Sequence, residues 1–119
     1  MNHPGRPLKS ELNPILSPTV RDIAWAAGVY EGEGHANKLG ITAMSQKEKW
    51  LLDRIRDLFG GSVGGPYKGS NNNQHYLWQL AGPRSRGFLM TIYLFLSPHR
   101  KEQIRKALKL GEYRIKAGN

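Results

Sequence analysis

The chain has 119 residues, with 18 Lys and Arg against 9 Asp and Glu and a formal net charge of +9. This length suits a single domain, the absence of cysteine excludes disulfides and thiolate zinc sites, and no apolar run approaches the ~18 residues of a membrane span. Residues 1–9 also lack the apolar centre of a secretion signal, so we expect a soluble intracellular protein with no membrane role.

The positive charge is concentrated in the second half, because residues 61–119 carry 10 Lys and Arg against 2 Asp and Glu. A basic surface can be merely solvated. Clustered cations also bind phosphates and release counterions, which favours nucleic acid as the partner.

Residues 1–17 contain three prolines and predict an extended arm, either flexible or lying along a nucleic-acid backbone. One domain is expected over 18–119. Its first helix should begin near Ser17-Pro18-Thr19, since both a Pro in the first turn and a Ser or Thr cap mark helix starts. Glycines 28, 32 and 34 should end it. One side of this helix carries, at helical spacing, Val20, Ile23, Ala24, Ala27, Gly28 and Glu31.

Two short strands with a turn at Lys38-Leu39-Gly40 are expected between residues 35 and 45. An amphipathic helix follows over 47–59, and its apolar stripe should hold Trp50, Leu51, Ile55, Leu58 and Phe59. Strands are then predicted over 62–68 and 75–81, where alternation directs Tyr76, Trp78 and Leu80 to the core. Two helices should complete the chain, one over 84–96 with Phe95 on its apolar side and one from Pro98 onward.

The first helix ends in two carboxylates, Glu31 and Glu33, that are one residue apart and flanked by glycines. Such an end suits a divalent metal, which prefers oxygen ligands. In a basic chain it suggests an enzyme that acts on a polyanion. The four histidines show no regular metal spacing, which argues against a zinc site.

The segment Ala26 to Gly34 resembles the signature of the LAGLIDADG homing endonucleases, in which an alanine-glycine pair leads through apolar residues to acid-glycine-acid-glycine. Later landmarks of the family are similar to Met44-Ser45-Gln46-Lys47 with the helix after it, to Tyr76-Leu77-Trp78 and to Pro98 through Gln103. The resemblance covers roughly residues 19–110. It implies an α+β fold of the αββαββα type, with a curved antiparallel sheet packed on helices and seated in the DNA major groove. An extra C-terminal helix is expected here.

The resemblance further implies a site-specific double-strand DNA endonuclease of a mobile intron, intein or phage element. A chain with one signature should act as a homodimer on a roughly palindromic target. The signature helices should then pack across the two-fold axis through Ala24, Ala27, Gly28 and Glu31. Alternatively, Ala24 and Gly28 pack only against the chain's own helices.

By position in the signature, Glu33 is the metal-binding acid and Gly32 offers its carbonyl to the same ion. The ion is expected to be Mg²⁺, or another divalent cation such as Mn²⁺, with no small-molecule cofactor. Glu31 should support the helix end. Gln46 matches a residue near the water and metal cluster, or it is a surface amide. Arg100, or Lys101 if the register slips by one, should lie near the scissile phosphate, or be a solvated charge. The expected DNA contacts are His35, Lys38, Lys68, Asn73, His75 and Gln79.

Three features depart from the family pattern. Both acids are Glu rather than Asp, and Tyr30 stands where a smaller residue is usual. Only 12 residues separate Glu33 from Gln46, so the first hairpin should reach only a few base pairs. Two rival functions therefore stay open: a non-catalytic scaffold, either a DNA-binding regulator or an RNA-binding splicing maturase, and an unrelated basic structural protein.

Overall fold

The computed structural model describes residues 12–37, 40–69 and 72–117, with side chains up to residue 109. The elements in chain order are α1 (Val20–Glu33), β1 (Gly34–Ala36), β2 (Ile41–Gln46), α2 (Lys49–Phe59), β3 (Ser62–Lys68), β4 (Gln74–Ala81), α3 (Pro83–Ile92), the 3₁₀ helix η1 (Tyr93–Phe95) and α4 (Pro98–Ala117). This order confirms the predicted α+β class and the predicted sequence of helices and strands. No helix in the described ranges is long and apolar enough to cross a membrane.

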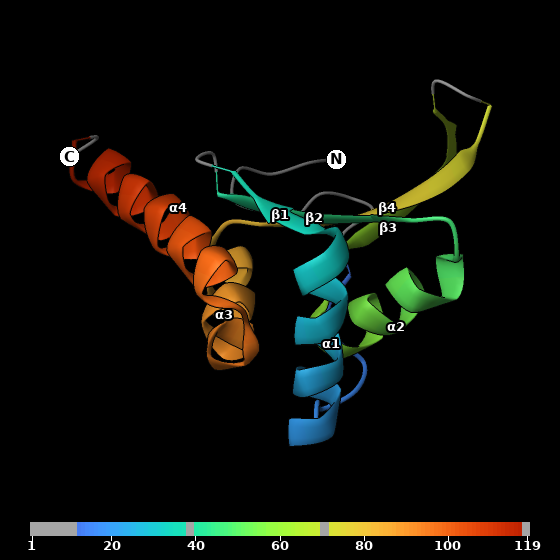
Figure 1. The fold of residues 1–119 in the computed structure, drawn as a ribbon, viewed down its shortest axis with the longest axis horizontal. Coiled ribbons are helices and arrows are strands. Elements are labelled where there is room, and N and C mark those ends of the chain that lie inside the picture. Colours follow the sequence, from blue (N-terminus) through green and yellow to red (C-terminus); the bar gives the residue numbers. More distant parts are fainter. Residues whose placement is uncertain (1–11, 38–39, 70–71, 118–119) are drawn as a thin grey trace, which may run out of the picture.

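The four strands form one antiparallel sheet in the order β1-β2-β4-β3. Figure 1 shows α1, α2 and α3 beneath one face of this sheet, with α4 along its edge. The pairs Met44–Trp78 and Thr42–Leu80 turn buried side chains toward the helices. The opposite face, which we call the open face, is covered by none of the described helices.

The two hairpins of the sheet differ in length. β1 has three residues and so spans about 10 Å, which agrees with the short first hairpin expected from the sequence. The β3–β4 hairpin is longer and bends away from the helices at its far end (Figure 1). The register shifts between Gly64 and Tyr67, and such a bulge bends a strand and increases its twist.

Helix α1 begins with a capping box. The Thr19 hydroxyl accepts the Asp22 N–H at 3.1 Å, and the Asp22 carboxylate accepts the Thr19 N–H at 3.0 Å. The helix continues through Gly28 and Gly32, both of which were expected to end it, and stops before Gly34. A glycine inside a helix costs only about 1 kcal/mol. The burial of one side of α1 outweighs that cost.

Two apolar residues expected in the core are exposed. Trp50 is 59% exposed, and Leu52 takes its place on the buried stripe of α2 with Ile55 and Leu58. Phe95 is also exposed, because the predicted helix over 84–96 stops at Ile92. The 3₁₀ turn that follows has three residues per turn rather than 3.6, so it changes the phase of the apolar pattern.

The part of the predicted arm that the structure describes, residues 12–17, is docked rather than free. Leu12 and Gly61 exchange two backbone hydrogen bonds of 2.8 and 2.9 Å, and the N–H groups of Ile15 and Leu16 donate to the Asp57 carbonyl. These bonds attach the segment to the end of α2 and the start of β3. Residues 1–11 lie outside the described ranges.

We expect the buried Thr42–Ser85 contact to show strong coupling. The two hydroxyl oxygens lie 2.6 Å apart between β2 and α3. Thr42→Val alone leaves the Ser85 hydroxyl unsatisfied and should lower the free energy of unfolding by about 1–3 kcal/mol. Thr42→Val with Ser85→Ala should cost less than the sum of the two single changes. Urea denaturation of all four proteins measures this, and simple additivity would contradict it.

Candidate functional site

The two signature carboxylates have different surroundings. Glu31 accepts the Ser97 backbone N–H on one oxygen and the Ser97 hydroxyl on the other, both at 2.8 Å. These bonds lower the pKa of Glu31, and the nearby charges of Arg100 and His99 lower it further. Glu33 is exposed, and its carboxylate makes no hydrogen bond or ion pair with any residue that the structure describes. Glu31 therefore joins α1 to α4, whereas Glu33 is available to a ligand.

Arg100 holds the other side of the same junction. Its Nε and Nη2 donate to the Glu31 carbonyl at 3.1 and 2.9 Å, and its Nη1 donates to the Gly34 carbonyl at 2.8 Å. We call Glu31, Ser97 and Arg100 together the α1–α4 clamp. Sequence reasoning placed Arg100 toward a scissile phosphate, but in the structure its guanidinium faces backbone carbonyls. Helix ends leave such carbonyls without internal partners, which explains the attraction.

Three of the predicted site residues line one hollow of about 410 Å³, which we call the Glu33 hollow. Its lining consists of Glu33, Ser45, Gln46, Lys47, Glu48 and His75. The register of the sheet explains why these residues lie close together. Gly34 pairs with Met44, so Glu33 comes beside Ser45, and Ser45 pairs with Leu77, two residues from His75.

Sequence reasoning missed Ser45, Lys47 and Glu48 as members of this group. Ser45 and Lys47 flank Gln46 in the segment that resembles a family landmark. Their position next to Gln46 could have indicated that they belong to the site. No sequence motif pointed to Glu48. It stands before α2 and makes no side-chain cap bond to that helix.

The oxygen donors of the Glu33 hollow fit magnesium only in part. Glu33 and Glu48 offer carboxylates, and Gln46 offers an amide oxygen. Among the described residues, no three His, Cys, Asp or Glu side chains come close enough to hold an ion by themselves. Mg²⁺ commonly binds one or two carboxylates and takes its other ligands from water and substrate phosphates. The donor set therefore fits a Mg²⁺ whose shell is completed from outside the single chain.

The other predicted contacts are scattered. Lys101 lies over the Tyr93 ring, 5.6 Å from its centroid, and does not line the Glu33 hollow. His35 and Gln79 both pair with Ala43 and so share the open face. Asn73 is exposed just before β4.

Two predicted DNA contacts cannot be placed as expected. Lys68 was expected on the face of the sheet away from the core. It pairs with Gln74, and Gln74 lies on the same face of β4 as Tyr76 and Trp78. Lys68 therefore lies on the face of the sheet that the helices cover. Lys38 lies outside the described residues.

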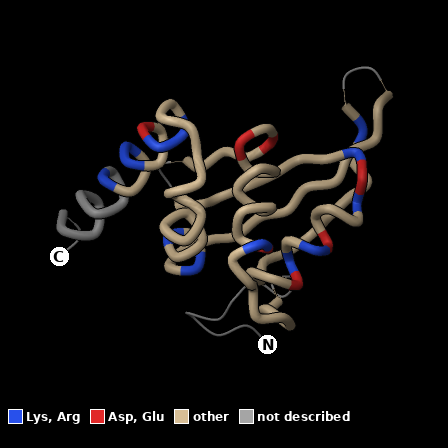
Figure 2. Tube along the Cα trace, turned by 60° about the horizontal axis from the view of Figure 1, so that its bottom comes forward, with Lys and Arg blue, Asp and Glu red and all other residues tan. Residues whose placement is uncertain are grey.

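The positive charge lies beside the sheet rather than on it. The four strands contain a single charged residue, Lys68. Figure 2 shows Lys and Arg along α4, which begins beside β1. The side chains described there are Arg100, Lys101, Arg105, Lys106 and Lys109. A polyanion on the open face would meet neutral polar groups from the strands and cations at the margin.

The outer side of α1 is lined with small residues that the chain's own packing does not require. Ala24, Gly28 and Gly32 are exposed, and a Cβ added at either glycine would meet no other atom within 4 Å. The alternative that Ala24 and Gly28 pack on the chain's own helices is therefore wrong. Ala27 is 1% exposed in the core, so its expected place in an interface is also wrong.

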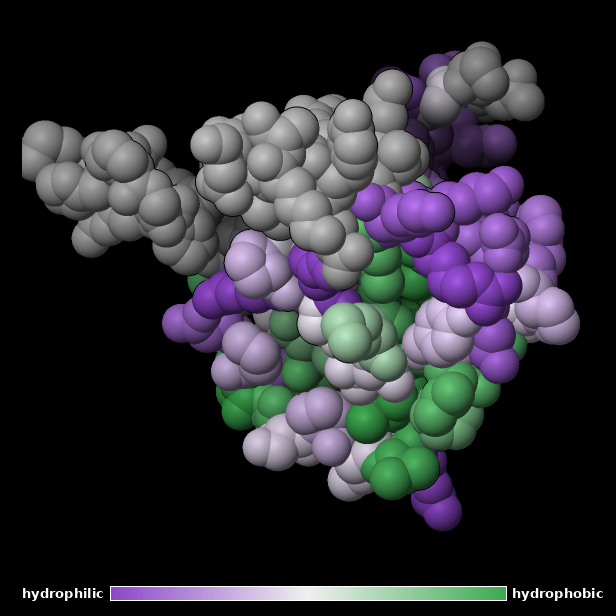
Figure 3. All heavy atoms as spheres, turned by 90° about the vertical axis from the view of Figure 1, so that its left-hand side faces the viewer, coloured by the Kyte–Doolittle hydropathy of each residue, from purple (hydrophilic) through white to green (hydrophobic). Residues whose placement is uncertain are grey.

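Two apolar side chains are exposed on α1 and on the 3₁₀ helix that contacts it. Val20 at the start of α1 is 73% exposed, and Leu94 in the adjoining η1 is 80% exposed. Figure 3 views the molecule from the side of α3 and α4, and apolar side chains gather on the lower part of this face.

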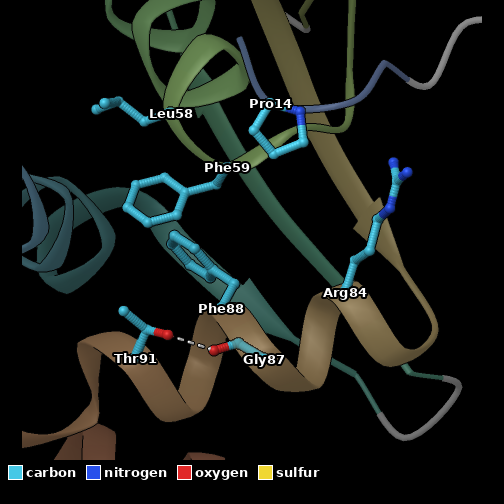
Figure 4. Close-up of a pocket in the computed structure, with 7 residues that line it drawn as sticks. All are labelled: Pro14, Leu58, Phe59, Arg84, Gly87, Phe88 and Thr91. Atoms are coloured by element: carbon cyan, nitrogen blue, oxygen red, sulfur yellow. Dashed lines mark hydrogen bonds between the residues drawn. The ribbon is translucent and has the colours of Figure 1, made fainter. Parts of the chain in front are cut away.

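A second hollow, of about 250 Å³, has mostly apolar walls. Its lining consists of Pro14, Leu58, Phe59, Arg84, Gly87, Phe88 and Thr91. Figure 4 shows the rings of Phe59 and Phe88 side by side, and their centroids are 4.9 Å apart. The Thr91 hydroxyl donates to the Gly87 carbonyl. This hollow offers no carboxylate or imidazole, so the Glu33 hollow remains the candidate site.

Comparison of the chain with models of known protein families finds no match, and comparison with curated protein sequences also finds none.

The pKa of Glu31 predicts a specific acid sensitivity. Because the folded state lowers this pKa, the stabilisation is complete above the ordinary Glu pKa of about 4.3 and is lost as pH falls through the folded pKa. The wild type should therefore lose more free energy of unfolding between about pH 7 and pH 3 than Glu31→Gln loses. Urea denaturation at several pH values measures this. An equal pH dependence of the wild type and Glu31→Gln would contradict the prediction.

Proposed function

We propose that this chain is a divalent-metal-dependent endonuclease of the LAGLIDADG homing type, which cleaves a roughly palindromic double-stranded DNA site as a homodimer. One observation carries the proposal: the exposed small-residue side of α1 leads directly to Glu33, a carboxylate without a partner among the described residues. This combination suits a helix that packs closely on another helix and delivers an acid beside the contact.

The second α1 helix would come from another copy of the chain. Each glycine in a helix costs about 1 kcal/mol relative to alanine, and no contact within the described chain accounts for Gly28 or Gly32. Close approach of two helix backbones would account for both. A two-fold contact along this side would also bring the two copies of Glu33 near the axis. Their mutual repulsion would be relieved by a cation, so metal binding and dimerisation should favour each other.

The open face is the surface proposed for DNA. His35 and Gln79 supply neutral hydrogen-bonding groups there, which read base edges in the major groove. Lys47 and the cations of α4 beyond Arg100 would contact phosphates. Because β1 has only three residues, the first hairpin should read few base pairs, and the longer β3–β4 hairpin should extend the contact.

In the proposed reaction, Glu33 and the Gly32 carbonyl would hold Mg²⁺. A bound Mg²⁺ would make a water more acidic and offset the charge that develops on the phosphate. Gln46 lines the same hollow and would orient the attacking water by its amide. Lys47 would stabilise negative charge on the phosphate oxygens, taking the part that the resemblance gave to Arg100 or Lys101.

Selection of cleaved sites from a random DNA library with Mg²⁺ provides the direct test, followed by cleavage kinetics on the selected site. Glu33→Gln should slow cleavage by about 100-fold or more, because it removes a charged metal ligand without changing size. Glu102→Gln, an exposed carboxylate on α4, should cleave as the wild type does. Specific binding without cleavage would instead support a regulator, and RNA binding without cleavage would support a maturase.

Gly28→Leu should convert the dimer to a monomer, because a bulky side chain on the outer side of α1 prevents close helix approach. Light scattering measures the mass. Gly87→Leu is a matched control, since Gly87 is also a helical glycine where an added Cβ meets nothing within 4 Å. A Gly28→Leu protein that remains dimeric would rule out this interface.

A further inference from the structure

We propose that Arg100 is a positioning residue that fixes the orientation of Glu33, rather than a group that contacts the scissile phosphate. The proposal rests on the endonuclease function proposed above, since it assigns the clamp a task within that site. Its structural basis, a guanidinium bound across the end of α1, is independent of any substrate.

The contacts of Arg100 bracket Glu33 along the backbone. Two guanidinium nitrogens donate to the carbonyl two residues before Glu33, and a third donates to the carbonyl one residue after it. The peptide units that carry Glu33 are therefore held from both sides by one rigid planar group. Rotation of the last turn of α1 would break these bonds.

The charge of Arg100 also has a local reason. The last turn of α1 contains Glu31 and Glu33 and no basic residue. Carboxylates at a helix C-terminus face the negative end of the helix dipole, which is unfavourable. Arg100 brings a cation from α4 to this end, and its guanidinium stacks over the buried Tyr30 ring at 5.5 Å from the centroid.

The opposite half of the clamp makes the junction reciprocal. Glu31 accepts two hydrogen bonds from Ser97, and the Ser97 hydroxyl accepts the Arg100 backbone N–H at 3.3 Å. Thus an acid of α1 binds Ser97, the residue just before α4, and Arg100 of α4 binds carbonyls at the end of α1 and the start of β1. Lys47, which lines the Glu33 hollow, is better placed than Arg100 to meet a phosphate there.

Arg100→Lys separates positioning from charge. Lysine retains the cation but cannot donate in the fixed planar fork that spans two carbonyls. We expect amide hydrogen exchange of residues 32–36 to accelerate about tenfold or more, and cleavage to slow by about 100-fold, as for a misplaced catalytic group. Arg54→Lys is the control, since Arg54 pairs with Asp22 and stacks on Trp25 away from this junction. It should leave both measurements unchanged.

Arg100→Gln tests for a phosphate contact. Loss of one such contact reduces the slope of log affinity against log salt by about 0.9 on duplex DNA. We expect Arg100→Gln to leave this slope unchanged and Lys47→Gln to reduce it by about that amount. The slopes are measured by fluorescence anisotropy of a labelled duplex, without metal.

Ser97→Ala provides a second test of the junction if changes at Arg100 prevent folding. It removes one donor to Glu31 without altering charge, and it should accelerate exchange in residues 32–36 by a smaller factor. The proposal is overturned if Arg100→Lys shows the amide exchange and the cleavage rate of the wild type. It is also overturned if Arg100→Gln reduces the slope of log affinity against log salt by the amount of one phosphate contact. If the wild-type protein does not cleave DNA, the endonuclease proposal fails, while the exchange data still decide whether Arg100 positions the end of α1.

Discussion

The junction between the end of α1 and the start of α4 is the contact on which the candidate site depends. An isolated α1 would end unfavourably, because its last turn carries two carboxylates beside carbonyls that have no internal partner. Arg100 binds two of those carbonyls, and Glu31 in turn binds Ser97 at the start of α4. Thus α4 supplies hydrogen-bond donors to the carbonyls at the end of α1, and α1 supplies an acceptor to the N–H group at the start of α4. Glu33 is left as the acid that the junction does not use.

Glycine has two distinct tasks within the seven residues from Gly28 to Gly34, at the end of α1 and the start of β1. At Gly34 a Cβ would lie 2.1 Å from the Tyr30 ring, so the chain's own core requires glycine there. At Gly28 and Gly32 the same addition would meet nothing within the described chain. The first requirement is internal, and the second is consistent with a partner that approaches from outside. The sequence alone, which has glycine at all three positions, does not distinguish the two requirements.

The distribution of charge divides the proposed DNA surface into two parts. The strands are almost neutral, and most of the described Lys and Arg residues lie on the helices, several of them along α4 (Figure 2). Phosphate contacts give affinity and position a protein on the duplex, whereas base-edge contacts give specificity. An open face that offers imidazole and amide groups, flanked by cations, suits this division.

The sequence by itself determined the order of helices and strands, the core positions of Trp78 and Leu80 and a Ser or Thr cap near residues 17–19, because periodicity and capping are local properties. The structure places that cap at Thr19. It also drew attention to Glu33 and Gln46, which share one hollow. Only the tertiary structure decided that Trp50 is exposed, that residues 12–17 are docked and that Arg100 turns to the end of α1. These outcomes depend on contacts between residues far apart in the chain. Arg100 and Gly34 are 66 positions apart in the sequence, so no periodic pattern indicates the hydrogen bond that joins them.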